Sequence, residues 1–204
     1  MGTIIALGGG RYDDGEVMPI FERIVRESGK EHPHVVFLPT AGHDDTEGDE
    51  PIWESFEKLG CTVETLKLTD PENTDKHIYD TLVSTDIVYA GGGNLEFMMN
   101  TFKATGADRA LREAYKRGKV LSGLSSGAMC WFDMGYDDCG ENGNFKFENS
   151  GAVLTKIIDI AVLAFLNLFR FERFDYFCKF SVRCDEARRN TGLLFFGIFE
   201  DRLA

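Results

Sequence analysis

Positive charge, histidine and long apolar runs are all scarce in this chain. Its 22 lysines and arginines stand against 34 aspartates and glutamates, which gives a net charge of −12. This balance argues against a nucleic-acid binder or a binder of anionic membranes, because both need clustered positive charge. No run of about 18 apolar residues appears, so we expect no membrane span. The opening MGTIIALGGG lacks a basic stretch and a long apolar core, so we expect no secretory signal and a cytoplasmic protein.

Histidine is the scarcest of the residue types that do acid–base chemistry. The four histidines all lie within the first 77 residues: His32, His34, His43 and His77. The five cysteines form no CxxC pair, and we expect reduced thiols and no metal site. An acidic run between Asp44 and Glu50 matches no calcium-loop spacing, and we expect solvated charge there.

The first 130 residues alternate between apolar runs and amphipathic segments. Strands are predicted at 3–7, 34–38, 62–68, 86–90 and 119–122, with helices between and after them. Strands that are apolar throughout indicate a mostly parallel sheet covered on both faces, that is, a three-layer α/β sandwich. Ligands of such sheets bind at the carboxyl ends of the strands, where the glycine-rich loops 8–10, 91–94 and 123–127 fall.

The clearest chemical motif is Gly123-Leu124-Ser125-Ser126-Gly127. It has the pattern G-x-S-x-G between a predicted strand and a predicted helix, which is the context of a nucleophile elbow. The tight turn projects the serine hydroxyl above the sheet, and the spacing of the two glycines selects Ser125 rather than Ser126. The alternative is a turn of small residues that only packs the helix against the strand.

A second glycine loop, Gly91-Gly92-Gly93-Asn94, follows the strand DIVYA. It is either a phosphate cradle or a second oxyanion-hole loop. It does not have the spacing G-x-G-x-x-G, so we expect no dinucleotide cofactor.

Four motifs in order, IIALGGG, VVFLPTAG, DIVYAGGGN and LSGLSSGAMCWF, resemble the S51 serine peptidases, the group of dipeptidase E and the cyanophycinases. The resemblance covers about residues 3–135. It implies a flavodoxin-like fold related to class I glutamine amidotransferases, and hydrolysis of short peptides through an acyl-enzyme without a cofactor. It further implies Ser125 as the nucleophile, with the amides of Gly93 and Ser126 as the oxyanion hole. Position 126 is commonly alanine in that family, and either residue supplies the same amide.

The chain departs from that family downstream of the serine. The family takes its general base from a histidine after the nucleophile, and no histidine or proline follows Ser125 here. A serine hydroxyl is a poor nucleophile without a base. Three explanations stay open: an altered or diverged chain beyond about residue 150, His43 as a substitute base, or an inactive relative that binds a peptide or an anion.

The composition changes near residue 150. Residues 1–150 carry a net charge of −13, and residues 151–204 carry +1 with nine of the 17 phenylalanines. We therefore predict an α/β peptidase-like domain over 1–150 and a divergent Phe-rich segment over 151–204, the altered end of the same domain. An exposed Phe-rich segment would favour either a homodimer or aggregation.

Overall fold

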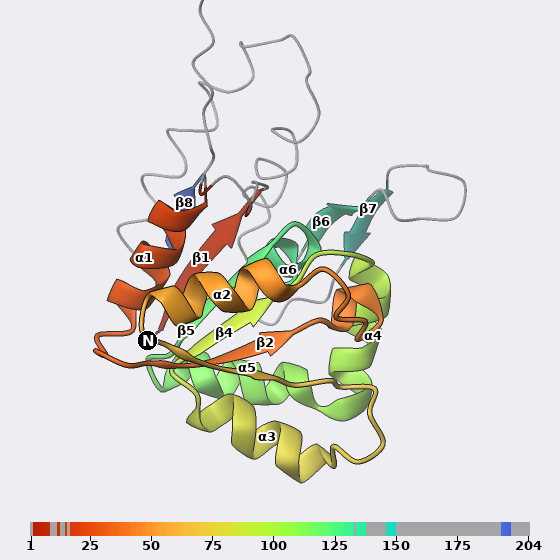
Figure 1. The fold of residues 1–204 in the computed structure, drawn as a ribbon. Helices are drawn as coiled ribbons and strands as arrows, with labels where there is room; N and C mark the ends of the chain where they lie inside the picture. The colour runs from red at the N-terminus through yellow and green to blue at the C-terminus, as the bar shows by residue number, and fades with distance from the viewer. Residues whose placement is uncertain are drawn as a thin grey trace, which may run out of the picture.

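The computed structural model describes residues 2–8, 12, 15 and 17–132, together with the backbone of three strands at 134–137, 146–149 and 193–196. The main sheet is built from β1 (Thr3–Leu7), β2 (His34–Leu38), β3 (Thr62–Thr65), β4 (Ile87–Ala90), β5 (Val120–Leu124) and β8 (Leu193–Phe196). The helices are α1 (Met18–Glu27), α2 (Glu50–Lys58), α3 (Asp75–Ser84), α4 (Leu95–Thr105), α5 (Ala107–Lys116) and α6 (Ser126–Met129), with a 3-10 turn, η1, at Thr40–Gly42. A hairpin of β6 (Met134–Asp137) and β7 (Lys146–Asn149) lies apart from the main sheet (Figure 1).

The strands of the main sheet are ordered β3-β2-β4-β5-β1-β8, and every pairing among them is parallel. The predicted parallel sheet is therefore confirmed. The pairing places Ala90 of β4 opposite Gly123 of β5, and Leu124 opposite Leu7 of β1. The carboxyl ends of β1, β4 and β5 thus meet at one edge, and the chain places two of its glycine-rich loops there.

Helices cover both faces of the sheet (Figure 1). Alternate residues along each strand point to opposite faces, which divides the core in two. The core on one face joins the sheet to α1 and α2, through Phe21, Phe56 and Tyr89 among others. The core on the other face joins it to α3, α4 and α5. This is the predicted three-layer α/β sandwich.

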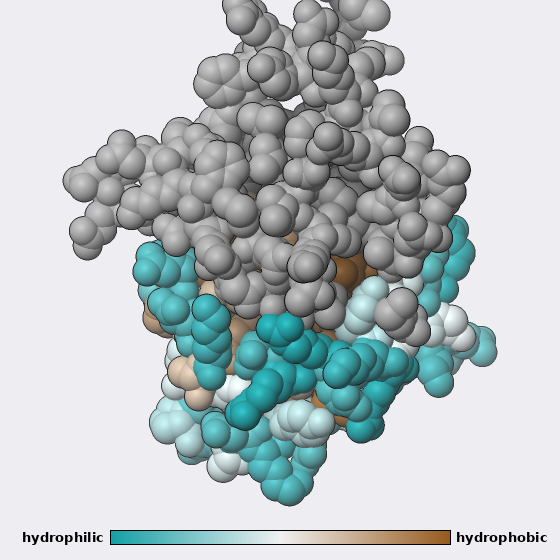
Figure 2. Space-filling model, turned by 180° about the vertical axis from the view of Figure 1, so that it is seen from behind, coloured by the Kyte–Doolittle hydropathy of each residue, from teal (hydrophilic) through white to brown (hydrophobic). Residues whose placement is uncertain are grey.

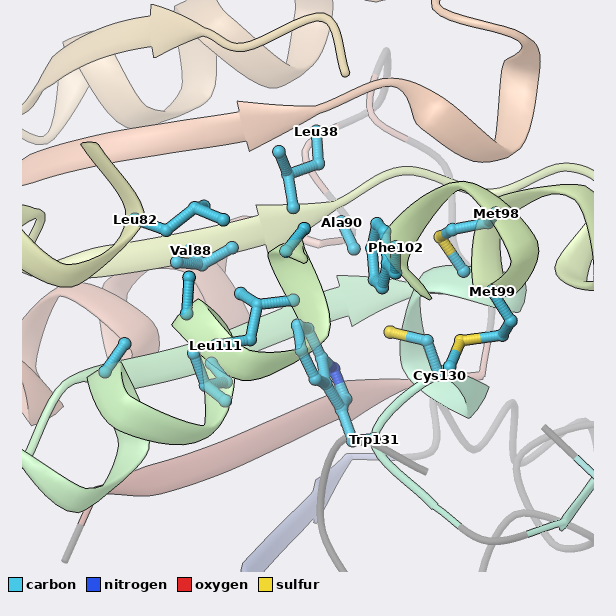
Figure 3. Packing of buried hydrophobic residues seen from close by; sticks show 14 of the residues in the cluster. Leu38, Leu82, Val88, Ala90, Met98, Met99, Phe102, Leu111, Cys130 and Trp131 are labelled. Atoms are coloured by element: carbon cyan, nitrogen blue, oxygen red, sulfur yellow. The ribbon is translucent and has the colours of Figure 1, made fainter. Parts of the chain in front are cut away.

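The core on the α3, α4 and α5 face contains residues of α4 and of the segment after α6 (Figure 3). Met98, Met99 and Phe102 of α4 pack together with Cys130 and Trp131, which follow α6. All five side chains are at most 2% exposed. The methionine pair and the Trp131-Phe132 pair are therefore core residues.

One predicted strand is shorter than expected, because the strand predicted over 62–68 ends at Thr65. The helix after β5 is short and ends at Met129. The predicted Phe-rich segment 151–204 lies, except for β8, outside the described residues.

Among the described residues, Tyr79 is the one large hydrophobic side chain that is exposed, and the described part of the rear surface is mainly hydrophilic (Figure 2). No helix in the described part is long and apolar enough to cross a membrane.

Candidate active site

Ser125 occupies a strained turn between β5 and α6. Its φ is +56° and its ψ is −121°, a conformation that residues with a side chain rarely adopt. The amide of Ser125 donates to the carbonyl of Leu7 at 3.0 Å, and its own carbonyl accepts the amide of Ala128 at 2.8 Å. Ser125 itself is half-buried. The geometry is that of a nucleophile elbow.

Both glycines of the motif are required by close backbone packing. A Cβ on Gly123 would lie 2.4 Å from the carbonyl oxygen of Gly127, and one on Gly127 would lie 2.0 Å from that of Ala90. A side chain at either position would force the elbow away from the end of β4. The structure thus gives a physical reason for the G-x-S-x-G spacing.

The loop Gly91–Asn94 lies against the elbow. A Cβ on Gly92 would lie 3.1 Å from the Cβ of Ser125 and 3.7 Å from its hydroxyl oxygen. Gly93 has a φ of +141°, and a Cβ there would lie 2.3 Å from the carbonyl oxygen of Ala41. Asn94 donates its amide to that same oxygen at 2.7 Å, and its side chain caps α4 by accepting the amide of Phe97 at 2.8 Å.

Ser126 is buried directly beneath this loop, at 1% exposure. Its amide is the first of α6 and therefore has no acceptor within the helix. Its hydroxyl donates a hydrogen bond to the carbonyl of Gly93. The resemblance selects Ser125, Gly93 and Ser126, and the structure brings their two segments together. Gly92, the neighbour of Gly93, lies beside Ser125, and Gly93 is hydrogen-bonded to Ser126.

A cavity of about 230 Å³ lies at the carboxyl ends of β2 and β4. Its lining comes from the end of β2 and the segment after it, and from the glycine loop after β4: Phe37, Pro39, Gly42, Asp45, Glu47, Asp49, Gly91 and Gly92. Ser125 is not among these lining residues. Gly92 connects the two, because it lines the cavity and its Cα also lies beside the Ser125 side chain.

Burial perturbs several titratable groups around this edge. It raises the pKa of Asp49, and the neighbouring charges of Glu50 and Asp45 raise it further. Burial also raises the pKa of Tyr12 to about 12, although a hydrogen bond to Tyr89 at 3.0 Å lowers it in part. The phenol of Tyr12 is therefore neutral at physiological pH and does not serve as a base there.

Cys130, five residues after Ser125, is fully buried, and burial raises the pKa of its thiol well above the usual range. The thiol stays protonated and donates to the carbonyl of Gly127 at 3.2 Å. Because the thiolate is the nucleophilic form, Cys130 is inert, and Ser125 is the nucleophile candidate at this turn.

The four histidines differ in their distance from this edge. His43 follows η1 and is exposed, with its ring 3.9 Å from that of Phe97 between centroids. Its neighbour Gly42 lines the cavity. Within the described part of the chain, no hydrogen bond joins His43 to Ser125. The other three lie elsewhere: His32 contacts the carbonyl of Gly60, His34 pairs with Glu64, and His77 is exposed on α3.

Asp44 corrects the expectation of solvated charge throughout the acidic run. It is 6% exposed and accepts the amide and hydroxyl of Thr69 at 2.7 and 2.8 Å. This carboxylate holds the segment after β2 to the segment after β3. Asp44 has a left-handed backbone conformation, with φ of +59°, that turns its side chain inward. The acidic sequence from Asp44 to Glu50 does not indicate this turn.

Sequence reasoning also missed three features of the site: the acidic wall of the cavity, the phenol pair of Tyr12 and Tyr89, and the bond from Ser126 to Gly93. Each depends on segments that are far apart along the chain. The spacing of motifs places loops at one edge of the sheet, but it does not specify which side chains meet there.

Known peptidases are similar to this chain in sequence. The model of peptidase family S51 matches residues 4–179, which extends further toward the C-terminus than the four motifs. The chain is 35% identical over 139 residues to the uncharacterized peptidase YgaJ of Bacillus subtilis (strain 168), covering 68% of this chain and 60% of the relative. It is 34% identical over 120 residues to the uncharacterized peptidase Lin0382 of Listeria innocua serovar 6a, covering 56% and 54%.

Two solved structures are also similar. One is a protein provisionally named peptidase E from Listeria monocytogenes EGD-e, with a TM-score of 0.55 and 27% identity, covering 66% of this chain and 63% of that one. The other, a peptidase from an acI-B1 Actinobacterium, has a TM-score of 0.59 at 17% identity and covers 72% and 63%; it bears on the fold alone. The chain thus spans roughly 54 to 63% of the relatives it matches.

Proposed function

The chain belongs to peptidase family S51, and from that premise we propose that it is a serine peptidase that hydrolyses short peptides in the manner of dipeptidase E, with Ser125 as its nucleophile. The observation that carries the proposal is the conformation of Ser125. Ser125 lies between a strand and a helix at φ +56°, where a side chain is unfavourable, and its crowded neighbours in the motif are glycines. The fold alone therefore does not require a side chain at position 125. Glycine would serve a purely structural turn better.

The reaction is a two-step acyl transfer. The hydroxyl oxygen of Ser125 bonds to the scissile carbonyl carbon, and its proton passes to a base. The amides of Gly93 and Ser126 stabilise the negative charge on the carbonyl oxygen. The peptide C–N bond then breaks, and the amine leaves with a proton. Water cleaves the resulting ester, which releases the acid and restores the hydroxyl.

We propose His43 as the base that this chain offers. It lies beside Gly42, which lines the same cavity as Gly92. A Cβ on Gly92 would in turn lie 3.1 Å from the Cβ of Ser125. The absence of a bond between His43 and Ser125 does not exclude the role, because catalytic hydrogen bonds often form only once substrate is bound. The exposed position of His43 leaves room for such a movement.

The size of the cavity supports a short peptide as the substrate. About 230 Å³ accommodates a small group rather than a long stretch of chain. The acidic side chains of Asp45, Glu47 and Asp49 make the cavity wall negative. A negatively charged group of the substrate is therefore disfavoured there.

A panel of dipeptides and tripeptides tests the proposal through release of free amine. We expect hydrolysis of at least one short peptide by the full chain, and none by Ser125→Ala. Hydrolysis that persists in Ser125→Ala would contradict Ser125 as the nucleophile. If no peptide is cleaved but some raise the melting temperature of the chain, the protein is a peptide-binding relative instead.

A further inference from the structure

The hydroxyl of Ser126 is a buried polar group that the proposed reaction does not use. The reaction needs only the amide of this residue. The hydroxyl nevertheless reaches out of α6 and donates to the carbonyl of Gly93, which belongs to the loop after β4. This partly buried hydrogen bond links α6 to a loop 33 residues earlier in the sequence, and it constrains both of them.

The bond restrains the peptide unit between Gly93 and Asn94 from one side. The amide of that unit donates to the carbonyl of Ala41 at 2.7 Å, and its carbonyl accepts from Ser126. The unit is therefore fixed at both ends. On the other side of the loop, the amide of Gly91 donates to the carbonyl of Leu38 at 2.9 Å.

Between these anchors lies the peptide unit that carries the Gly93 amide. Both of its flanking residues, Gly92 and Gly93, are glycines, so side chains do little to limit its rotation. Holding the neighbouring unit therefore limits the directions that the Gly93 amide can take, because the two units share the Gly93 Cα. Oxyanion donors stabilise a transition state only when they are aimed before the reaction begins.

We infer that Ser126 is a positioning residue, whose hydroxyl fixes the orientation of the Gly93 amide relative to the amide of Ser126 itself, so that the two act as one oxyanion hole. This inference rests on the proposed function for its catalytic meaning, but the link between the loops is a property of the fold. Ser126 contributes twice: its amide faces the oxyanion, and its side chain aims the second donor.

Ser126→Ala tests the inference, with Ser122→Ala as the matched control. Ser122 lies in β5, is fully buried and donates its hydroxyl to the carbonyl of Ile5 at 2.7 Å. Both variants remove a hydroxyl-to-carbonyl hydrogen bond made by a buried serine, and only the bond of Ser126 reaches the loop 91–94. The rate of modification by a fluorophosphonate probe is measured against probe concentration, which separates binding from the covalent step.

We expect Ser126→Ala to lower the maximal rate of the covalent step about 3- to 10-fold with unchanged probe binding, and Ser122→Ala to leave both unchanged. Equal rates for Ser126→Ala and the wild-type chain, or an equal fall in both variants, would overturn the inference. The equal fall would mean that lost stability explains the effect.

Hydrogen–deuterium exchange gives a second readout that needs no activity. We expect faster amide exchange over residues 91–94 in Ser126→Ala and not in Ser122→Ala; unchanged exchange would overturn the link between the loops. If the wild-type chain is not labelled at all, the proposed function fails. The exchange data then decide the structural part of the inference separately.

Discussion

The amide of Ser125 donates to the carbonyl of Leu7 at 3.0 Å, so the turn residue is still held by the neighbouring strand of the sheet. Its carbonyl is held from the other side by the amides of Ala128 and Met129 at 2.8 and 3.1 Å. Bonds on both sides prevent the backbone from relaxing, and they keep Ser125 at a positive φ. The elbow thus stores strain that the rest of the fold must offset.

That strain predicts an unusual order of stability among variants of Ser125. Alanine keeps the strained conformation, whereas glycine adopts it freely. We expect Ser125→Gly to be more stable than Ser125→Ala by about 1 kcal/mol, since strain of about 1–3 kcal/mol is partly cancelled by the greater flexibility of unfolded glycine. Urea unfolding measures the difference. Equal or reversed stabilities would show that residue 125 is not strained.

Gly127 should tolerate no side chain. A Cβ there would lie 2.0 Å from the carbonyl oxygen of Ala90, so we expect Gly127→Ala to lower the free energy of unfolding by about 3 kcal/mol. Gly42→Ala is the control, because a Cβ at that glycine would meet nothing within 4 Å. Its expected change is below about 0.5 kcal/mol. Similar losses in the two variants would argue against close packing at the elbow.

Asp49 should make stability depend on pH in a defined direction. Burial raises its pKa in the folded chain, so the folded state binds the proton more tightly than the unfolded state. Stability from this group is therefore lost as the pH rises from the usual aspartate pKa through the raised one. Asp49→Asn removes that loss, and Asp49 makes no side-chain cap on α2 that would be lost with it.

We expect Asp49→Asn to melt at a higher temperature than the wild-type chain at pH 7, and the difference to shrink as the pH is lowered toward about 4. Glu57→Gln, on the exposed face of the same helix, is the control and should change little at either pH. A lower melting temperature for Asp49→Asn at pH 7 would show that the carboxylate is stabilised in the folded chain.

His43 is tested by His43→Gln. If its imidazole is the base, the rate of fluorophosphonate labelling falls by about 100-fold or more. His77→Gln, an exposed histidine on α3, should label at the wild-type rate. Unchanged melting temperature would confirm that the lost contact with Phe97 does not explain the fall. Labelling of His43→Gln at the wild-type rate would contradict His43 as the base.

The alternation of apolar runs and helices was enough to predict the layers of the fold, because the strands at 3–7 and 34–38 are buried on both faces and read as continuous apolar segments. The turn at Ser125 was also predictable, since only small residues fit around it. The inward turn of Asp44 and the bond from Ser126 to Gly93 were not. Both depend on contacts between loops that periodicity does not encode.

The most direct test of the central proposal is covalent labelling of the wild-type chain by a fluorophosphonate, followed by intact mass measurement and peptide mapping. We predict a single adduct, located on Ser125, and its complete loss in Ser125→Ala while the variant stays folded. An unlabelled wild-type chain, or an adduct that survives in Ser125→Ala, would contradict the assignment of Ser125 as a working nucleophile.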